Sequence, residues 1–403
     1  MRTSTNNLIG ACLSVALLAA CGGNSGLSAS VPASGAAPRS QARFAQRDAG
    51  SSNLQYAYVA NLGSSTVDAY TINPESGVLK SLGSVGGAGQ GPEYVAFDPT
   101  GKFAYVPSFY SNNASGFAVK TSSGALKPVK GSPFAAGTEP YAAAIDPSGK
   151  FLYVVNWDSN NVYAYTINAS SGALTPVVGS PFAAGTEPDG VAIDTSGKFV
   201  YVTDYGSSSG SGSGVSAYAI DGSSGALTQL TGSPFAAGIG PYFVAVDPKS
   251  NFAYVANWGS DNVSAYTIDE SSGTLTQVTG SPFGAGTNCD GVTVDPEGKF
   301  VYVVNYGSNN VSAYTVNTSG GGLTQVTGSP FAAGTEPDSV AVDATSKFAY
   351  TANIGSKNVS AYAINSMSGA LKPVKGSPFA AGVGPSGVSI CSRVGRLCIP
   401  PPL

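Results

Sequence analysis

A repeat of 48 residues is the feature that most constrains how this chain folds. The tripeptide Ser-Pro-Phe recurs at steps of 48 residues, with a single step of 53, and its aromatic residues are Phe134, Phe182, Phe235, Phe283, Phe331 and Phe379. The long step contains a Gly/Ser run between Tyr205 and Val215, which predicts a loop insertion. A period of this size is typical of stacked or radial repeats, in which each unit needs neighbours to bury its faces.

Each repeat contains four short strand patterns separated by turn residues. In one copy the strands are expected over 190–193, 199–203 and 215–220, with a fourth that ends at Ser-Pro-Phe, and Asp-Thr-Ser-Gly-Lys forms the first hairpin turn. The strand over 199–203 is apolar on both faces, as expected for a strand between neighbouring sheets. With 53 Gly and only 10% charged residues, long amphipathic helices are excluded. The sequence predicts an all-β propeller of four-stranded antiparallel blades.

The strand count predicts how the ring closes. The first and second strands of the repeat each occur seven times, but the chain begins with a second strand and ends with a first strand. We therefore expect residues 387–390 to supply the inner strand of the blade that residues 55–61 begin, which removes two free sheet edges. The prediction is a monomeric seven-bladed ring over 53–392, followed by a tail over 393–403.

The amino-terminal segment is predicted to export and anchor the protein. Residues 1–20 contain one cation and a short apolar run, which is typical of a signal peptide. They end in Leu-Ala-Ala followed by Cys21, which resembles the bacterial lipoprotein cleavage box and predicts acylation of Cys21. Residues 21–52 then form a Ser/Ala/Gly/Pro tether to a membrane of the cell envelope, on its periplasmic or surface side. In that oxidising setting, Cys391 and Cys398 are predicted to form a disulfide.

Charge and composition exclude several kinds of chemistry. The net charge is -4, and the Arg residues all lie outside the repeats, which argues against a nucleic-acid partner. The chain has no His, so Ser-His-Asp and Cys-His nucleophile systems and the usual His-containing zinc sites are excluded. No matched acid, base and nucleophile is evident, which favours a binding module over an enzyme.

Acidic residues are expected to gather on one face of the ring. In a propeller, the loops between blades and the turns between the second and third strands lie around the channel mouth. These loops carry Glu93, Glu139, Glu187, Asp189, Asp290, Glu336 and Asp338. Mutual repulsion predicts a divalent cation such as Ca²⁺, with Glu93, Glu187, Asp189, Asp290, Glu336 and Asp338 as ligands and strand-end Asn residues as further oxygen donors. The alternative is ordinary turn chemistry, in which Asn bonds its own turn and the acids face water.

Aromatic residues vary between blades on the same face. Trp157 and Trp258 replace a Tyr of the sister blades, and Tyr141 and Tyr242 stand where other blades have Asp. Aromatic rings beside polar groups suit stacking on sugars, whereas the alternative is that they fill space between loops. The predicted ligand-binding residues are Tyr110, Tyr141, Trp157, Tyr242 and Trp258, and the predicted partner is a glycan, a peptide or an envelope protein.

The Tyr-Val-x-Asn strands, the Asp-Pro-x-Gly-Lys turn over 146–150 and the Ser-Gly-x-Leu turns resemble the Tyr-Val-Thr-Asn repeat propellers and the seven-bladed lactonase family, which includes 6-phosphogluconolactonase-like proteins. The resemblance implies a seven-bladed fold and lactone hydrolysis. Active members use Arg, His and Glu in the central funnel, and the ring here has neither Arg nor His, so no catalytic residue carries over. The alternative to a binding module is therefore a lactonase that uses Glu139, Glu187 or Glu336 with a bound divalent cation.

Overall fold

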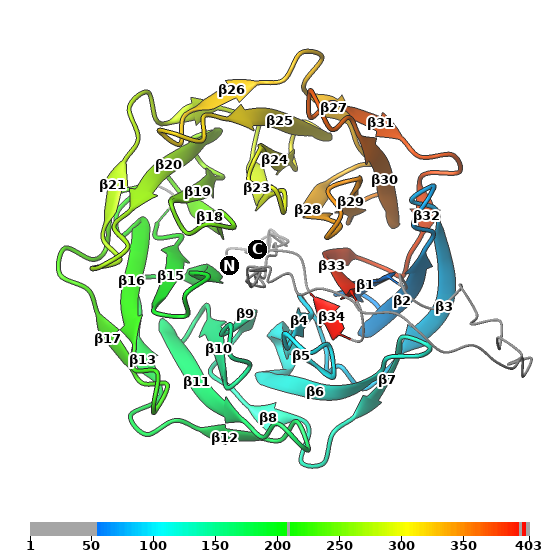
Figure 1. Cartoon of the computed structure of the whole chain (residues 1–403). Coiled ribbons are helices and arrows are strands. Elements are labelled where there is room, and N and C mark those ends of the chain that lie inside the picture. The colour runs from blue at the N-terminus through cyan, green and yellow to red at the C-terminus, as the bar shows by residue number, and fades with distance from the viewer. Residues whose placement is uncertain (1–54, 208–209, 395–396, 400–403) are drawn as a thin grey trace, which may run out of the picture.

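The computed structural model describes residues 55–207, 210–394 and 397–399 and confirms an all-β ring of seven blades. The blades follow one another around a central axis; the first strand lies innermost in blades 2 to 7, and β33 (Pro385–Val394) and β34 (Leu397–Ile399) lie on the inner side of β1 (Gln55–Asn61) in blade 1 (Figure 1). In the described part of the chain, no helix has the length and apolar character needed to cross a membrane.

Blade 1 joins the two ends of the ring. It contains β1 (Gln55–Asn61), β2 (Thr66–Ile72), β3 (Leu79–Val85), β33 (Pro385–Val394) and β34 (Leu397–Ile399). Blade 2 contains β4 (Ala96–Phe97), β5 (Phe103–Ser108), the 3₁₀ turn η1 (Phe109–Ser111), β6 (Asn113–Lys120), β7 (Ala125–Pro128) and β8 (Phe134–Ala135). Blade 3 contains β9 (Pro140–Ile145), β10 (Phe151–Asn156), β11 (Asn161–Ile167), β12 (Leu174–Pro176) and β13 (Phe182–Ala183).

The remaining blades repeat the same order. Blade 4 contains β14 (Pro188–Ile193), β15 (Phe199–Asp204), β16 (Gly214–Ile220) and β17 (Leu227–Gln229). Blade 5 contains β18 (Pro241–Val246), β19 (Phe252–Asn257), β20 (Asn262–Ile268), β21 (Leu275–Gln277) and β22 (Phe283–Gly284). Blade 6 contains β23 (Cys289–Val294), β24 (Phe300–Asn305), β25 (Asn310–Val316), β26 (Leu323–Gln325) and β27 (Phe331–Ala332). Blade 7 contains β28 (Pro337–Val342), β29 (Phe348–Asn353), β30 (Asn358–Ile364), β31 (Leu371–Pro373) and β32 (Phe379–Ala380).

The closure predicted from the strand count is confirmed. Strand β33 pairs antiparallel with β1, with Ala57 opposite Ile390 and Val59 opposite Val388. The first and last parts of the ring therefore share one sheet, and neither β1 nor β33 is left as a free edge.

The hairpin turns form because an Asp caps each of them. In blade 3 the Asp146 carboxylate accepts backbone hydrogen bonds from Ser148 (3.0 Å), Lys150 (2.8 Å) and Phe151 (2.7 Å). Gly149 supplies the positive φ of 70° that the turn requires. The repeated Asp-Pro-x-Gly-Lys motif is thus explained by turn geometry.

A second repeated contact ties each blade to a neighbouring one. The Tyr of the second strand donates its hydroxyl to the carbonyl of a turn Gly in a neighbouring blade, as Tyr153 does to Gly225 at 3.0 Å. The other pairs are Tyr58–Gly124, Tyr105–Gly172, Tyr201–Gly273, Tyr254–Gly321, Tyr302–Gly369 and Tyr350–Gly77. These bonds explain why the Tyr-Val and Ser-Gly motifs recur together.

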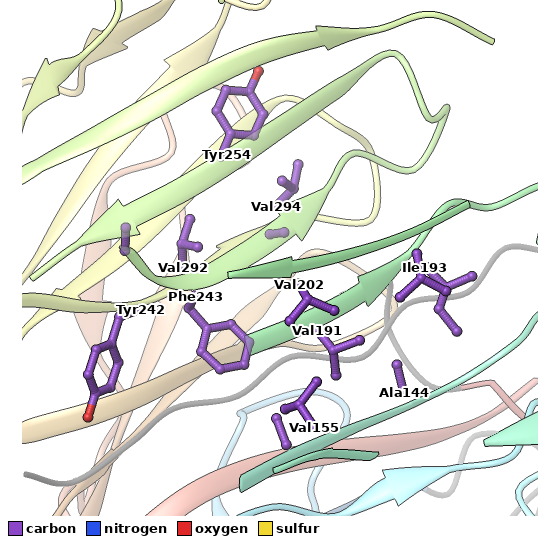
Figure 2. Packing of buried hydrophobic residues seen from close by; sticks show 14 of the residues in the cluster. Ala144, Val155, Val191, Ile193, Val202, Tyr242, Phe243, Tyr254, Val292 and Val294 are labelled. Carbon is purple, nitrogen blue, oxygen red and sulfur yellow. The ribbon is translucent and has the colours of Figure 1, made fainter. Parts of the chain in front are cut away.

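The core lies between adjacent blades. Aliphatic residues of β14 and β15 pack against β18, and Figure 2 shows Val191, Val202 and Phe243 in this layer. The outer edge differs from the prediction, because the Ser-Pro-Phe tripeptide does not end a single fourth strand. Instead a turn with a cis Ser180-Pro181 bond separates two short segments, β12 and β13, which both pair with β11.

Three sequence predictions lie outside the described residues. They are the signal peptide, the tether of residues 21–52 and the acylation of Cys21. The side chain of Cys398 is also outside the described part, so its disulfide with Cys391 stays a prediction.

Candidate functional site

Three sets of equivalent positions surround the axis on one face, which we call the funnel face. The inner ring is the second residue of each inner-strand segment: Glu93, Tyr141, Asp189, Tyr242, Asp290, Asp338 and Ser386. The rim ring lies two residues earlier: Gly91, Glu139, Glu187, Gly240, Asn288, Glu336 and Gly384. The turn ring follows the end of each second strand: Leu62, Phe109, Trp157, Tyr205, Trp258, Tyr306 and Ile354.

Backbone hydrogen bonds fix the turn ring against the rim ring. The Trp157 amide donates to the Glu139 carbonyl at 2.8 Å, and the Tyr205 amide donates to the Glu187 carbonyl at 3.0 Å. The same bond forms in every blade. All rim residues have positive φ, which Gly and Asn tolerate, yet three of these positions hold Glu. The Glu139 amide also donates to Asn112 Oδ1 of the preceding blade at 2.9 Å.

Aromatic side chains of the inner strands meet across the centre of the ring. The Tyr141 and Tyr242 hydroxyls hydrogen-bond at 2.8 Å, and these residues are 2% and 0% exposed. Tyr94 of blade 2 contacts Phe243 of blade 5, with ring centroids 5.9 Å apart. Buried aromatic side chains therefore fill the space near the axis beneath the funnel face.

Aromatic residues of the turn ring continue this group of side chains into an unbroken aromatic arc over blades 2 to 6. Each aromatic ring contacts the next at a centroid separation of 5.1–5.7 Å. The arc consists of Tyr110, Phe109, Tyr141, Trp157, Tyr205, Tyr242, Trp258 and Tyr306. Tyr110 is 49% exposed, and Phe109, Trp157, Tyr205, Trp258 and Tyr306 are partly exposed, so the outer part of the arc is open to a ligand.

The four inner-ring acids Glu93, Asp189, Asp290 and Asp338 are buried, and the pKa values of two of them are raised. Burial raises the pKa of Asp189 well above its usual value, and the charges of Asp290, Glu93 and Glu187 add to the effect. Burial likewise raises the pKa of Glu93, partly offset by a hydrogen bond from Ser386. No hydrogen-bond partner is found for either Asp189 carboxylate oxygen or for Glu93 Oε2. Such groups are suited to donating a proton.

The rim acids differ from the inner acids in exposure. The pKa of Glu139 is raised by partial burial and by the charges of Asp158 and Glu187, and the pKa of Glu187 by partial burial and by Asp158. Glu139 and Glu187 occupy equivalent rim positions of neighbouring blades, and Asp158 directly follows Trp157 in the turn ring. Glu336 instead accepts a hydrogen bond from Tyr306 at the other end of the arc.

The carboxylates predicted as one metal site are divided between the two rings. Glu93, Asp189, Asp290 and Asp338 are inner-ring residues, and Glu187 and Glu336 are rim residues. Within the described residues, no three His, Cys, Asp or Glu side chains are grouped as a metal site requires. Calcium binding stays a prediction.

The strand-end Asn residues have structural roles, as the turn-chemistry alternative expects. Asn156 Oδ1 accepts a hydrogen bond from the Gly137 amide at 2.9 Å, and its Nδ2 donates to Asn161 Oδ1 at 2.9 Å. The equivalent oxygens of Asn257, Asn305 and Asn353 accept from Gly238, Gly286 and Gly334. These amide oxygens are thus engaged in holding the loops.

All five residues predicted to bind a ligand lie in the aromatic arc, although their role in binding stays a prediction. Sequence reasoning did not include Phe109, Tyr205 and Tyr306 among them. The missed signal is that an aromatic residue follows the end of the second strand in five consecutive blades, whereas blades 1 and 7 have Leu62 and Ile354. Asp158, directly after Trp157, was also missed.

Comparison with protein families matches the ring to one family. The model described as "Lactonase, 7-bladed beta-propeller" matches residues 49–137, 132–187 and 188–385. The comparison with curated proteins found no match.

Solved structures share the fold at low sequence identity. A putative 6-phosphogluconolactonase from Bacteroides uniformis is 18% identical with a TM-score of 0.73, covering 84% of this chain and 99% of its own. The periplasmic gluconolactonase PpgL of Pseudomonas aeruginosa is 21% identical with a TM-score of 0.71, covering 86% of this chain and 100% of its own. At these identities the likeness establishes the fold alone.

Proposed function

Because the chain belongs to the lactonase family of seven-bladed β-propellers, we propose that its funnel face binds a saccharide or a sugar-derived ring. The observation that carries this proposal is the aromatic arc, which presents partly exposed Trp and Tyr rings beside carboxylates. Sugar rings stack their C–H faces on aromatic rings while neighbouring polar groups accept their hydroxyl hydrogen bonds. Two proteins of the same fold are described as gluconolactonases, which are named for sugar-derived lactones.

A protein that only binds a sugar at the arc needs no catalytic side chains, and few candidates for such side chains are present. The chain has no His, and burial raises the pKa of the Cys289 thiol, which donates to the carbonyls of Asn257 and Asn262 at 3.2 Å. A thiol in that state is a weak nucleophile. The arrangement therefore favours a binding protein over an enzyme that works through a covalent intermediate.

The experiment is a titration of intrinsic tryptophan fluorescence with neutral oligosaccharides, including the tetramer of N-acetylglucosamine and cellotetraose. The chain has two Trp residues, and both lie in the arc, so the emission reports on this face alone. Saturable changes would support the proposal. A flat response with every oligosaccharide of this panel would contradict it.

Hydrolysis of sugar lactones is a second candidate. It is favoured by the pair Glu139 and Glu187, whose pKa values are raised toward the range in which a carboxyl group acts as a general acid or base. Such a base would activate water against a lactone carbonyl. Proton release from a panel of sugar and aliphatic lactones tests it, with and without calcium. Turnover that is lost in Glu187→Gln but kept in Glu75→Gln would support it, and the absence of turnover above buffer would exclude it for that panel.

We also propose that the ring works outside the cytoplasm, anchored through Cys21. The apolar run of residues 1–20 supports export, and one neighbour with the same fold is described as periplasmic. Metabolic labelling with a fatty acid tests the anchor. Label in the wild-type protein and its loss in Cys21→Ser would support acylation, and an unlabelled wild-type protein would contradict it.

A further inference from the structure

Positive charge follows the outer edge of three neighbouring blades. In every blade a buried Leu of the outer strand is followed by an exposed residue whose identity differs between blades. In blades 7, 1 and 2 this residue is Lys372 of β31, Lys80 of β3 and Lys127 of β7. In blades 3 to 6 it is a Thr: Thr175, Thr228, Thr276 and Thr324. Because blades 7, 1 and 2 adjoin one another, the three Lys residues share one side of the ring (Figure 1).

The neighbouring residues strengthen this contrast. The outer turns and edges of blades 7, 1 and 2, at residues 365–379, 73–85 and 120–134, contain six Lys and one Glu, a net charge of +5. The same segments of blades 3 to 6 contain three acids and no Lys, a net charge of -3. Within the described residues the one ion pair joins Lys299 to Glu297, so none of the six Lys is ion-paired there. We call these six exposed residues the basic edge: Lys80, Lys120, Lys127, Lys130, Lys372 and Lys375.

Hydrogen bonds hold the three blades together as one surface. The Tyr70 hydroxyl of blade 1 donates to the Ala380 carbonyl of blade 7 at 2.8 Å, and the Tyr58 hydroxyl of blade 1 donates to the Gly124 carbonyl of blade 2 at 2.8 Å. Between these contacts Leu82 of β3 has no partner in the register with β2 and is 45% exposed. An exposed aliphatic side chain among cations is typical of surfaces that enter the headgroup region of a bilayer.

The chain also enters the ring at the middle of this surface. The tether predicted over residues 21–52 leads into β1, which belongs to blade 1, and blade 1 lies between blades 7 and 2. A lipid on Cys21 would therefore hold the membrane within reach of the blade that the basic edge is centred on. A lipid chain and a basic surface together hold a protein to a bilayer more firmly than either does alone.

We propose that the basic edge docks on a bilayer of anionic phospholipid, with Leu82 entering the headgroup region. Lys side chains are attracted to an anionic lipid surface over about a Debye length, so this edge turns toward the membrane. The acids on the far side of the ring, Asp221, Asp269 and Glu270, turn away from it. Docking by an outer edge lays the ring axis along the membrane plane and leaves the funnel face open. The inference concerns a separate surface and does not rest on the saccharide function.

The test measures binding to vesicles without the lipid anchor. It uses residues 21–403 with Cys21→Ser, which keep the whole ring and remove the acylation site. Vesicles of phosphatidylcholine alone are compared with vesicles that contain about one third phosphatidylglycerol, and bound protein is separated by flotation. We expect binding to the anionic vesicles only, and its loss in about 0.5 M NaCl, because salt screens exposed charges. Equal binding to the two kinds of vesicle, or to neither, would overturn the inference.

Two variants with the same change in charge separate the basic edge from net charge. The edge variant Lys80→Thr/Lys127→Thr/Lys372→Thr gives blades 7, 1 and 2 the residue of the other four blades, so it should keep its thermal midpoint. We expect its binding to anionic vesicles to fall about tenfold or more. The control variant Lys150→Thr/Lys198→Thr/Lys249→Thr removes three exposed Lys from hairpin turns of blades 3, 4 and 5 and should bind as the wild type does.

The outcomes distinguish the partner and the surface. Equal losses in the two variants would overturn the basic edge as the docking surface, because net charge would then explain the binding. Binding to polyglutamate in solution but not to anionic vesicles would replace the bilayer with an acidic macromolecule. The edge variant should keep the saccharide titration of the wild type, since the arc lies on the funnel face, so failure of docking leaves the saccharide function standing.

Discussion

The hydroxyl groups of Tyr141 and Tyr242 lie 2.8 Å apart, although their blades are separated by blade 4. This contact crosses the centre of the propeller. It involves two aromatic side chains of the arc, both near the buried Asp189. Burial raises the pKa of both phenols further above the neutral range, so both hydroxyls stay protonated at neutral pH. A hydrogen bond between two uncharged phenols, Tyr141 and Tyr242, thus joins blades 3 and 5 near the axis.

Removing either hydroxyl should reveal this coupling. Tyr242→Phe takes away the hydrogen-bond partner of Tyr141, and we expect the free energy of unfolding to fall by about 1–3 kcal/mol. The double variant Tyr141→Phe/Tyr242→Phe should cost less than the sum of the single changes. Denaturant unfolding of the four proteins measures the difference. Strict additivity would show that the two hydroxyls do not interact.

Trp157 should contribute more to binding than to folding. Trp157→Ala removes the ring over which we place the sugar, and we expect saccharide affinity to fall about tenfold or more. Its control is Tyr163→Ala, which removes an aromatic ring from β11 of the same blade, away from the arc. Calorimetry on both variants checks this. Equal loss of affinity in the two would count against the arc as the binding surface.

Asp204 should make stability depend on pH. Burial raises the pKa of Asp204 from its ordinary value of 3.8 to about 7, while hydrogen bonds from Ser216 and Gly185 oppose the rise. The folded state therefore keeps a proton that the unfolded state releases, and stability is lost as the pH rises from about 4 to about 7. The loss reaches about 4 kcal/mol at most.

Asp204→Asn should remove that dependence. Sister blades have Asn at this position, and the Asn257 amide donates to Ser264 where Asp204 accepts from Ser216. The variant is expected to be more stable than the wild type above about pH 7 and similar near about pH 4. Urea unfolding across this range measures it. Parallel pH profiles for the two proteins would refute the assignment.

The ring closure should be sensitive to one glycine of β33. A Cβ atom at Gly387 would lie 2.3 Å from Tyr94 Cδ1 and 2.4 Å from the Glu93 carbonyl oxygen. Gly387→Ala is therefore expected to lower the free energy of unfolding by about 1–3 kcal/mol. The control is Gly86→Ala, where the added atom meets nothing within 4 Å. A thermal midpoint unchanged in Gly387→Ala would mean that this junction is loosely packed.

The sequence was sufficient to predict the ring and its closure. Turn residues and strand periodicity are local signals that can be recognised in the sequence. The chain begins with a second strand of the repeat and ends with a first strand, so residues 387–390 had to pair with residues 55–61. The outer edge was not predictable in the same way. Ser-Pro-Phe marks the end of a repeat, but only the structure shows that the segments on either side of it pair with one strand.

The site was predicted in part because equivalent positions can be aligned in a repeat. Tyr141, Asp189 and Tyr242 were recognised as equivalent from their place before each inner strand. The sequence did not show that these three side chains are buried whereas Glu139 and Glu187, two residues earlier, are partly exposed. A spacing of two residues does not by itself show which side chain is buried. The contact of Tyr141 with Tyr242 depends on the curvature of the whole ring.

The most direct test of the central claim is tryptophan fluorescence of the purified protein during titration with the N-acetylglucosamine tetramer and with cellotetraose. Trp157 and Trp258 are the two Trp residues of the chain, and both belong to the arc. The account predicts a saturable change in emission and loss of most of the signal in Trp157→Phe. Emission that stays constant through both titrations would contradict the assignment of the funnel face as a saccharide site.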